Sequence, residues 1–171
     1  MRKSIIAAAV AVAATSVHAQ TPTWQYYEDG SAPLQAFVIA KDGAQLILKC
    51  DKPGKGKVLA VFVAKAPIAA PLANGRFESR EVLVQVDDGG PYDDNLRFND
   101  RFAMAVNQHS ERSLTRLLEK IADGQKLDIT LRPFKQAPVQ MSFAIGGARA
   151  AIAKVYEACK DNTSPLAPTA G

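Results

Sequence analysis

Apolar and polar residues alternate along most of the chain, which is the pattern of β-strands that bury one face. The alternation is clearest at 139–145, where Val139, Met141 and Phe143 are separated by polar residues. Similar runs predict a short strand around Trp24 and further strands at 34–40, 44–50, 58–64, 81–86, 96–98, 102–106 and 127–131. The pattern therefore predicts a protein built mainly from β-strands.

Two segments show the spacing of an amphipathic helix instead. One is 110–123, where Ser110 is a candidate N-cap and apolar residues recur from Leu114 to Ile121. The other is 147–160, whose apolar stripe ends at Cys159. Clean alternation in most strands suits a sheet with one solvated face. We therefore predict an α+β fold, with an antiparallel sheet of seven to nine strands, open or strongly curled, and two helices packed on one face.

Two cysteines, Cys50 and Cys159, occur in the chain. Cys50 shares the apolar face of its strand with Leu46 and Leu48, and Cys159 lies on the apolar stripe of the last helix. The spacing excludes a Cys-x-x-Cys redox motif. We expect a structural disulfide between them rather than a redox-active thiol pair, which suits an oxidising compartment.

The first residues have the composition of a secretory signal peptide. Arg2 and Lys3 precede an apolar run at 5–14, and Val17-His18-Ala19 fits a cleavage site after Ala19. We expect a signal peptide at 1–19, a single α+β domain at 20–160 and a disordered tail at 161–171, where Pro, Thr and Ala show no periodicity. The expected location is the periplasm or the outside of the cell, without a membrane anchor.

The charge of the chain argues against nucleic acid as a partner. Of its 21 basic residues, Arg2 and Lys3 fall in the expected signal peptide, so the net charge of +4 becomes +2 after cleavage. That excess is too small to indicate binding to a polyanion.

Two groups of residues are candidates for binding. Four carboxylates at 87–95 could coordinate calcium, although turn chemistry alone explains this Asp- and Gly-rich run; they are Asp87, Asp88, Asp93 and Asp94. Four aromatic residues could form an exposed recognition surface, with burial of Trp24 in the core as the alternative; they are Trp24, Tyr26, Tyr27 and Tyr92. We expect no bound metal and no cofactor.

The sequence contains no catalytic motif. His109, the one histidine after the signal peptide, lies close to serines but lacks a Gly-x-Ser-x-Gly elbow, and a lone histidine cannot supply the usual zinc ligands. A glycosidase-like pair of carboxylates has several candidates, namely Glu81, Asp87, Asp88, Asp100 and Asp128. We assign none of these residues a catalytic role.

The order of several short motifs resembles small periplasmic proteins of the TagO/VasI type, which are accessories of type VI secretion, and other exported families of the same build. The motifs are an early Trp24, Leu-Ile-Leu-Lys-Cys at 46–50, Asp-Asp-Gly at 87–89, Leu-Leu at 117–118, Arg-Pro at 132–133, Phe-Ala-Ile-Gly-Gly at 143–147 and Ala-Cys at 158–159. The resemblance implies an accessory role and carries over no catalytic residues.

The function that we expect is therefore a non-catalytic accessory or binding protein of the bacterial cell envelope, associated with secretion and acting on an envelope protein partner. One alternative is an envelope hydrolase that uses a carboxylate pair or His109. The other is a small-ligand carrier, which would hold its ligand in an apolar cavity. The sequence leaves the oligomeric state and the partner open.

Overall fold

The computed structural model describes residues 24–30, 32–50, 56–73, 76–108 and 110–166. The predicted signal peptide and His109 lie outside these residues. Within them, nine strands form one antiparallel sheet, as predicted. Their bounds are β1 Gln25–Asp29, β2 Ala32–Ile39, β3 Gln45–Cys50, β4 Val58–Val63, β5 Glu78–Val86, β6 Tyr92–Asn99, β7 Phe102–Ala105, β10 Lys126–Leu131 and β11 Val139–Ala144.

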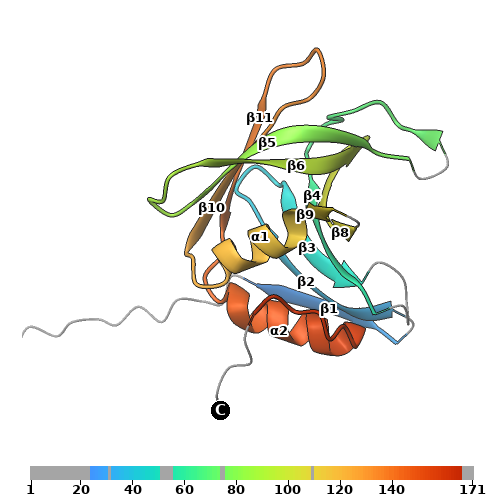
Figure 1. Cartoon of the computed structure of the whole chain (residues 1–171), viewed down its shortest axis with the longest axis vertical. Helices are drawn as coiled ribbons and strands as arrows, with labels where there is room; N and C mark the ends of the chain where they lie inside the picture. The colour runs from blue at the N-terminus through green and yellow to red at the C-terminus, as the bar shows by residue number, and fades with distance from the viewer. Residues whose placement is uncertain (1–23, 31, 51–55, 74–75, 109, 167–171) are drawn as a thin grey trace, which may run out of the picture.

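The order of the strands in the sheet is β1-β2-β3-β4-β7-β6-β5-β10-β11 (Figure 1). Two further short strands, β8 (Asn107–Gln108) and β9 (Glu111–Arg112), pair with each other as a separate ribbon. This ribbon was not predicted, because a two-residue strand leaves no alternation to detect.

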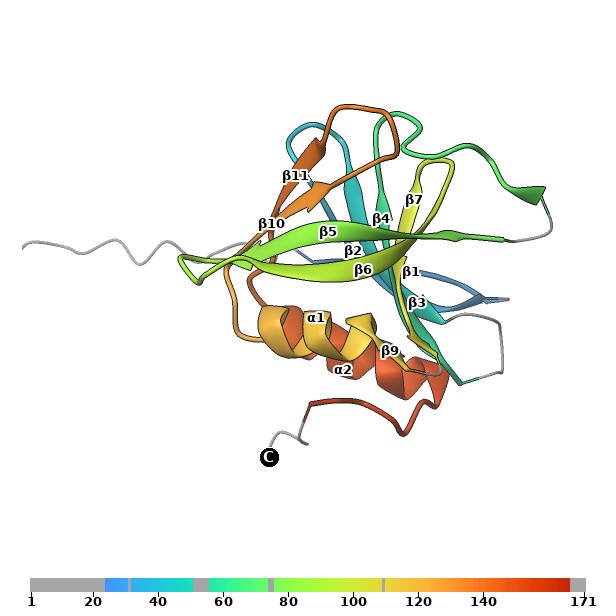
Figure 2. The ribbon, with the colours of Figure 1, turned by 45° about the horizontal axis from the view of Figure 1, so that its top comes forward.

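The two helices are α1 (Ser113–Ile121) and α2 (Ala148–Cys159). Figure 2 shows both of them on one side of the sheet. α2 packs on β2 and β3 through Ala151, Ile152 and Val155, and α1 contacts β6 and β7. These contacts place the apolar stripes of both helices in the same core as one face of the sheet.

The first helix begins later than predicted. Residues 111–112 belong to β9, and Arg112 stands at the N-cap without a side-chain hydrogen bond. Ser110 is therefore not the cap. The hydroxyl of Ser113 instead bonds both the N–H and the C=O of Val106, at 3.1 Å each, which fixes the start of the helix against the end of β7.

Large apolar side chains fill the space between the sheet and the helices. Phe62, Phe98 and Phe143 are fully buried, together with Leu118 of α1 and Ile152 of α2. Removing a side chain of this size from water contributes about 1.5–3 kcal/mol. The core therefore provides the main stabilisation of the fold.

Trp24 connects the two ends of the strand order. Its indole is buried, and Nε1–H donates to the carbonyl of Ile145 at 3.1 Å. Trp24 immediately precedes β1 and Ile145 immediately follows β11, although these strands lie at opposite ends of the sheet. The two ends thus approach each other without pairing as strands.

The disulfide between Cys50 and Cys159 is confirmed. It joins the end of β3 to the end of α2, with the two Cα atoms 5.6 Å apart and a sequence separation of 109. This bond fixes the last turn of α2 against the sheet.

Two further segments, the start of β6 and residues 161–166, differ from their predicted structure. β6 begins at Tyr92, inside the segment predicted as a turn, because Tyr92 and Asp94 pair with Val84 and Val82 of β5. The segment 161–166, predicted as part of a disordered tail, is held in place because the buried side chain of Asp161 accepts a hydrogen bond from Val58 N–H at 2.9 Å. Residues 167–171 lie outside the described residues.

Candidate functional site

The face of the sheet that points away from the helices is apolar over four neighbouring strands. Backbone pairing places Phe37, Ile47, Val61 and Met104 side by side on β2, β3, β4 and β7, and the row ends at Arg97 of β6. Leu59, Val63 and Phe102 extend the same surface along the strands. We call this surface the apolar face, and its members are Phe37, Ile47, Leu59, Val61, Val63, Phe102 and Met104.

Strand β4 explains why the apolar face exists. Its sequence Val-Leu-Ala-Val-Phe-Val is apolar at every position. Val58, Ala60 and Phe62 belong to the main core, whereas Leu59 and Val61 point to the other side and do not. Leu59 and Val61 are still only 7% and 6% exposed. Both side chains are therefore buried on this second face as well.

The other half of the same face is mostly polar, with Leu83 as an apolar exception. On β5, β10 and β11 the outward positions include Ser79, Glu81, Asp128, Gln140 and Ser142. This half has the alternation expected of a solvated sheet face. The apolar face is therefore a local feature of β2, β3, β4 and β7.

A groove with a volume of about 770 Å³ runs over the apolar face. Ile47, Leu59, Val61, Val63 and Met104 contribute to its floor. It continues past the ends of β4 and β7 as far as α1. Its volume is in the range of pockets that bind small molecules, about 300–1,000 Å³.

Exposed aromatic side chains border one end of the groove. Phe102 is 42% exposed and Phe77 is 36% exposed. Asn99 holds the adjacent loop, because its side chain accepts from Leu72 N–H at 3.0 Å and donates to the carbonyl of Arg76 at 3.0 Å. These two hydrogen bonds hold Leu72 and Arg76 close to Asn99, on the side of the groove where Phe77 lies.

Positive charge gathers in the groove lining, which contains Lys49, Lys57, Arg97 and Arg112. Asp161 is the one carboxylate among the described lining residues. A pair of carboxylates that could serve a hydrolase is therefore absent from this described lining.

Two of these four cations have acidic partners. Arg97 forms an ion pair with Glu111 at 2.8 Å, and Lys57 lies 3.7 Å from Asp161. Lys49 and Arg112 have no carboxylate partner within the part of the chain that the structure describes. The described lining of the groove thus carries an excess of positive charge.

Asp161 keeps its negative charge despite its burial. Burial alone would raise the pKa of this carboxyl, but hydrogen bonds from Thr163 and from Val58 N–H, together with the charge of Lys57, lower the pKa below its ordinary value. The ionised carboxylate ties residues 161–163 to the start of β4, next to the groove.

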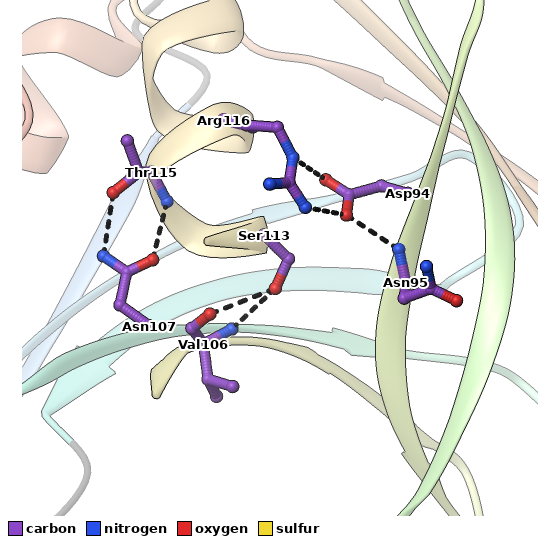
Figure 3. A network of polar contacts seen from close by, with 7 residues as sticks. All are labelled: Asp94, Asn95, Val106, Asn107, Ser113, Thr115 and Arg116. Atoms are coloured by element: carbon purple, nitrogen blue, oxygen red, sulfur yellow. Dashed lines mark hydrogen bonds and ion pairs between the residues drawn. The ribbon is translucent and has the colours of Figure 1, made fainter. Parts of the chain in front are cut away.

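A polar network fixes the wall of the groove formed by β8, β9 and α1 (Figure 3). The side-chain amide of Asn107 donates to the Thr115 hydroxyl at 2.9 Å and accepts from Thr115 N–H at 3.1 Å. Arg116 of α1 forms a two-point ion pair with Asp94 of β6. These contacts attach the start of α1 to two strands and hold the wall in a defined position.

The predicted recognition surface is not a single surface. Trp24 is in the core, which corrects its place in that set and confirms the alternative prediction. Tyr26 and Tyr27 are exposed at the β1 edge, at 40% and 53%. Tyr92 is half-buried on β6, where its hydroxyl has no hydrogen-bond partner among the described residues and where burial raises its pKa to about 12.

The four predicted calcium ligands lie in different surroundings. Asp87 accepts hydrogen bonds from the N–H groups of Gln125 and Lys126, at 2.9 and 2.7 Å. Asp88 is exposed. Asp93 faces Arg132 at 3.4 Å, and Asp94 lies on the opposite face of β6 against Arg116. Within the described ranges, no group of three or more His, Cys, Asp or Glu side chains is arranged to hold a metal ion.

Sequence reasoning missed the apolar face as a site. The signal was the unbroken apolar run at 58–63, which marks a strand with two apolar faces rather than one. The cationic lining could not be found in this way, because Lys49, Arg97 and Arg112 are brought together only by the strand order.

Comparison with protein-family models, with curated proteins and with solved structures finds no match to this chain. Among the described residues, no helix has the length and apolar character needed to cross a membrane.

Proposed function

We propose that this protein is an exported, non-catalytic binding protein of the bacterial cell envelope, and that it binds through the apolar face. The observation that carries this proposal is the groove of about 770 Å³ over that face. A contiguous apolar surface that is rimmed by polar residues is typical of a binding site in a folded protein.

The contrast between the two halves of the outward sheet face supports a binding role. Phe102 is exposed and contributes little to the core. On the polar half of the outward face, strand positions that point the same way carry polar residues such as Gln140. An apolar surface open to water reduces solubility unless a ligand or partner covers it. Binding accounts for this arrangement more directly than folding does.

Export is supported by two independent features. Residues 1–19 have the composition of a signal peptide, and the Cys50–Cys159 disulfide is typical of an oxidising compartment. The resemblance to TagO/VasI-type proteins adds a secretion-associated accessory role to this proposal.

Photo-crosslinking in the producing cells tests the proposal. A photoreactive phenylalanine analogue replaces Phe102 in one variant and Gln140, on the polar half, in the matched control. We expect a discrete adduct from position 102 in the envelope fraction and none from position 140. Equal labelling at both positions, or no adduct at position 102 in folded protein, would contradict the proposal.

A further inference from the structure

We propose that the groove takes a single-chain anionic amphiphile, with its anionic head beside Lys49 and Arg112 and its apolar tail directed toward Phe102. This inference rests on the binding function proposed above and adds the chemical class of the ligand.

The groove has a cationic end and an apolar end. Along β3, β4 and β7 the outward residues form successive rows, in which Lys49 pairs with Leu59, Ile47 pairs with Val61, and Val63 pairs with Phe102. Rows on one face of a strand are about 6.8 Å apart, so the Lys49 and Phe102 rows are separated by roughly 14 Å. A ligand with one charged end and one apolar end matches this polarity.

Among the described residues, the cationic end carries more positive than negative charge. Lys49 and Arg112 have no carboxylate partner among the described residues, whereas Arg97 and Lys57 are partly neutralised by Glu111 and Asp161. Cations beside an apolar floor favour an anionic group, because hydrogen bonds between oppositely charged groups are stronger than neutral ones and are less screened away from bulk water. Lys49 and Arg112 therefore favour a carboxylate, phosphate or sulfonate head.

The floor of the groove favours an acyl chain over an extended peptide. β3, β4 and β7 each have a neighbouring strand on both sides, so their backbone groups are already paired within the sheet. An extended peptide lying across this face would leave its own N–H and C=O groups without partners, and leaving such groups dry is costly. A hydrocarbon tail has no such groups and gains from contact with Ile47, Val61 and Met104.

Isothermal titration calorimetry of the full-length exported protein tests the ligand class. The probes share a dodecyl tail and differ in the head: dodecanoate, dodecyl phosphate and dodecyltrimethylammonium, each below its micelle concentration. Acetate and inorganic phosphate serve as heads without a tail. We expect the two anionic amphiphiles to bind at least about tenfold more tightly than the cationic one, and the free heads to show no measurable binding.

Two variants test where the head and the tail lie. Lys49→Gln combined with Arg112→Gln should remove most of the preference for anionic heads. The matched control, Lys120→Gln combined with Lys126→Gln, removes the same charge elsewhere and should leave the preference intact. Phe102→Ser should weaken all three amphiphiles. Thermal melting of each variant confirms that it is folded.

The outcomes separate this inference from the proposed function. Equal affinity for anionic and cationic amphiphiles, or equal effects of the two double variants, would overturn the anionic ligand class. Tight binding of an acidic amphipathic peptide without binding of the amphiphiles would also overturn it, while the crosslink at position 102 would still support the apolar face as a binding surface. Comparison of dodecanoate with dodecyl phosphate identifies the preferred head.

Discussion

Asp94 carries a carboxylate that is almost completely withdrawn from water. Its side chain is 3% exposed, and it accepts hydrogen bonds from Arg116 and from Asn95 N–H, the latter at 2.7 Å. Arg116 is about half exposed, so the two partners are not equivalent. Loss of Arg116 would leave a buried charge alone, whereas loss of Asp94 would leave an arginine that can reach solvent.

This asymmetry gives a testable prediction. We expect Arg116→Ala to lower the free energy of unfolding by about 3–5 kcal/mol and Asp94→Leu to lower it by about 1–3 kcal/mol. The double variant Asp94→Leu with Arg116→Leu should be more stable than Arg116→Ala. Urea denaturation measures all three. Equal losses for the two single variants would show that the pair is solvated in solution.

Asp161 is a second residue whose ionisation affects the region of the groove. Burial opposes the charge, but hydrogen bonds from Thr163 and Val58 lower the pKa of Asp161 below 3.8. A carboxyl whose pKa is lower in the folded than in the unfolded state stabilises the fold above its unfolded pKa, and this contribution disappears as the pH falls through the folded pKa.

The stability advantage of wild-type protein over Asp161→Asn should therefore be constant above about pH 5. It should shrink progressively as the pH falls below 3.8, the ordinary value for this carboxyl. Urea midpoints at a series of pH values measure this difference, and the other acidic groups cancel because both proteins contain them. A difference that does not change with pH would contradict this role of the ionised carboxylate.

At the scale of elements, hydrophobic periodicity located all nine strands of the main sheet but not every boundary. The start of β6 was missed because aspartate is common in turns. The contact that allows Asp94 to be buried in a strand comes from Arg116, 22 residues later in the sequence. The start of α1 was missed because serine is a common N-cap residue, which made Ser110 a candidate. Residues 111–112 instead form β9 and pair with β8, so the helix begins after them. In both cases a contact outside the local window decided the structure.

The Cys50–Cys159 disulfide is the covalent link between elements. Because it links two cysteines with a sequence separation of 109, we expect the double variant Cys50→Ala with Cys159→Ala to lose about 4–5 kcal/mol of unfolding free energy. A reducing agent should destabilise the wild-type protein by a similar amount and leave the variant unaffected. If reduction left the wild-type urea midpoint unchanged, the bond would not be stabilising the fold.

In the described part of the chain, the nine-stranded sheet has one face that forms the main core and a second face that is apolar only over β2, β3, β4 and β7. The first is covered by α1 and α2, and the second is covered only in part. The fold class followed from local patterns, since alternation and helical spacing are visible in short windows. The candidate site could not be predicted in this way. Ile47, Val61 and Met104 lie on three different strands and become neighbours only through the order of those strands in the sheet.

The two faces should respond differently to truncation of a phenylalanine. We expect Phe143→Ala, in the main core, to lower the free energy of unfolding by about 3–5 kcal/mol. Phe102→Ala, on the apolar face, should cost about 1 kcal/mol or less, because that side chain is already partly in water. Chemical denaturation compares the two variants. A cost of Phe102→Ala as large as that of Phe143→Ala would mean that the apolar face serves folding rather than binding.

An equilibrium titration with the fluorescent apolar anion anilinonaphthalene sulfonate tests the apolar face as a binding surface most directly. The wild-type protein should bind the dye saturably, and dodecyl phosphate should displace it. Phe102→Glu should weaken binding at least about tenfold, which corresponds to about 1.4 kcal/mol. Gln140→Glu, which adds the same charge to the polar half of the face, should leave binding unchanged. Equal affinities of the two folded variants for the dye would contradict the account.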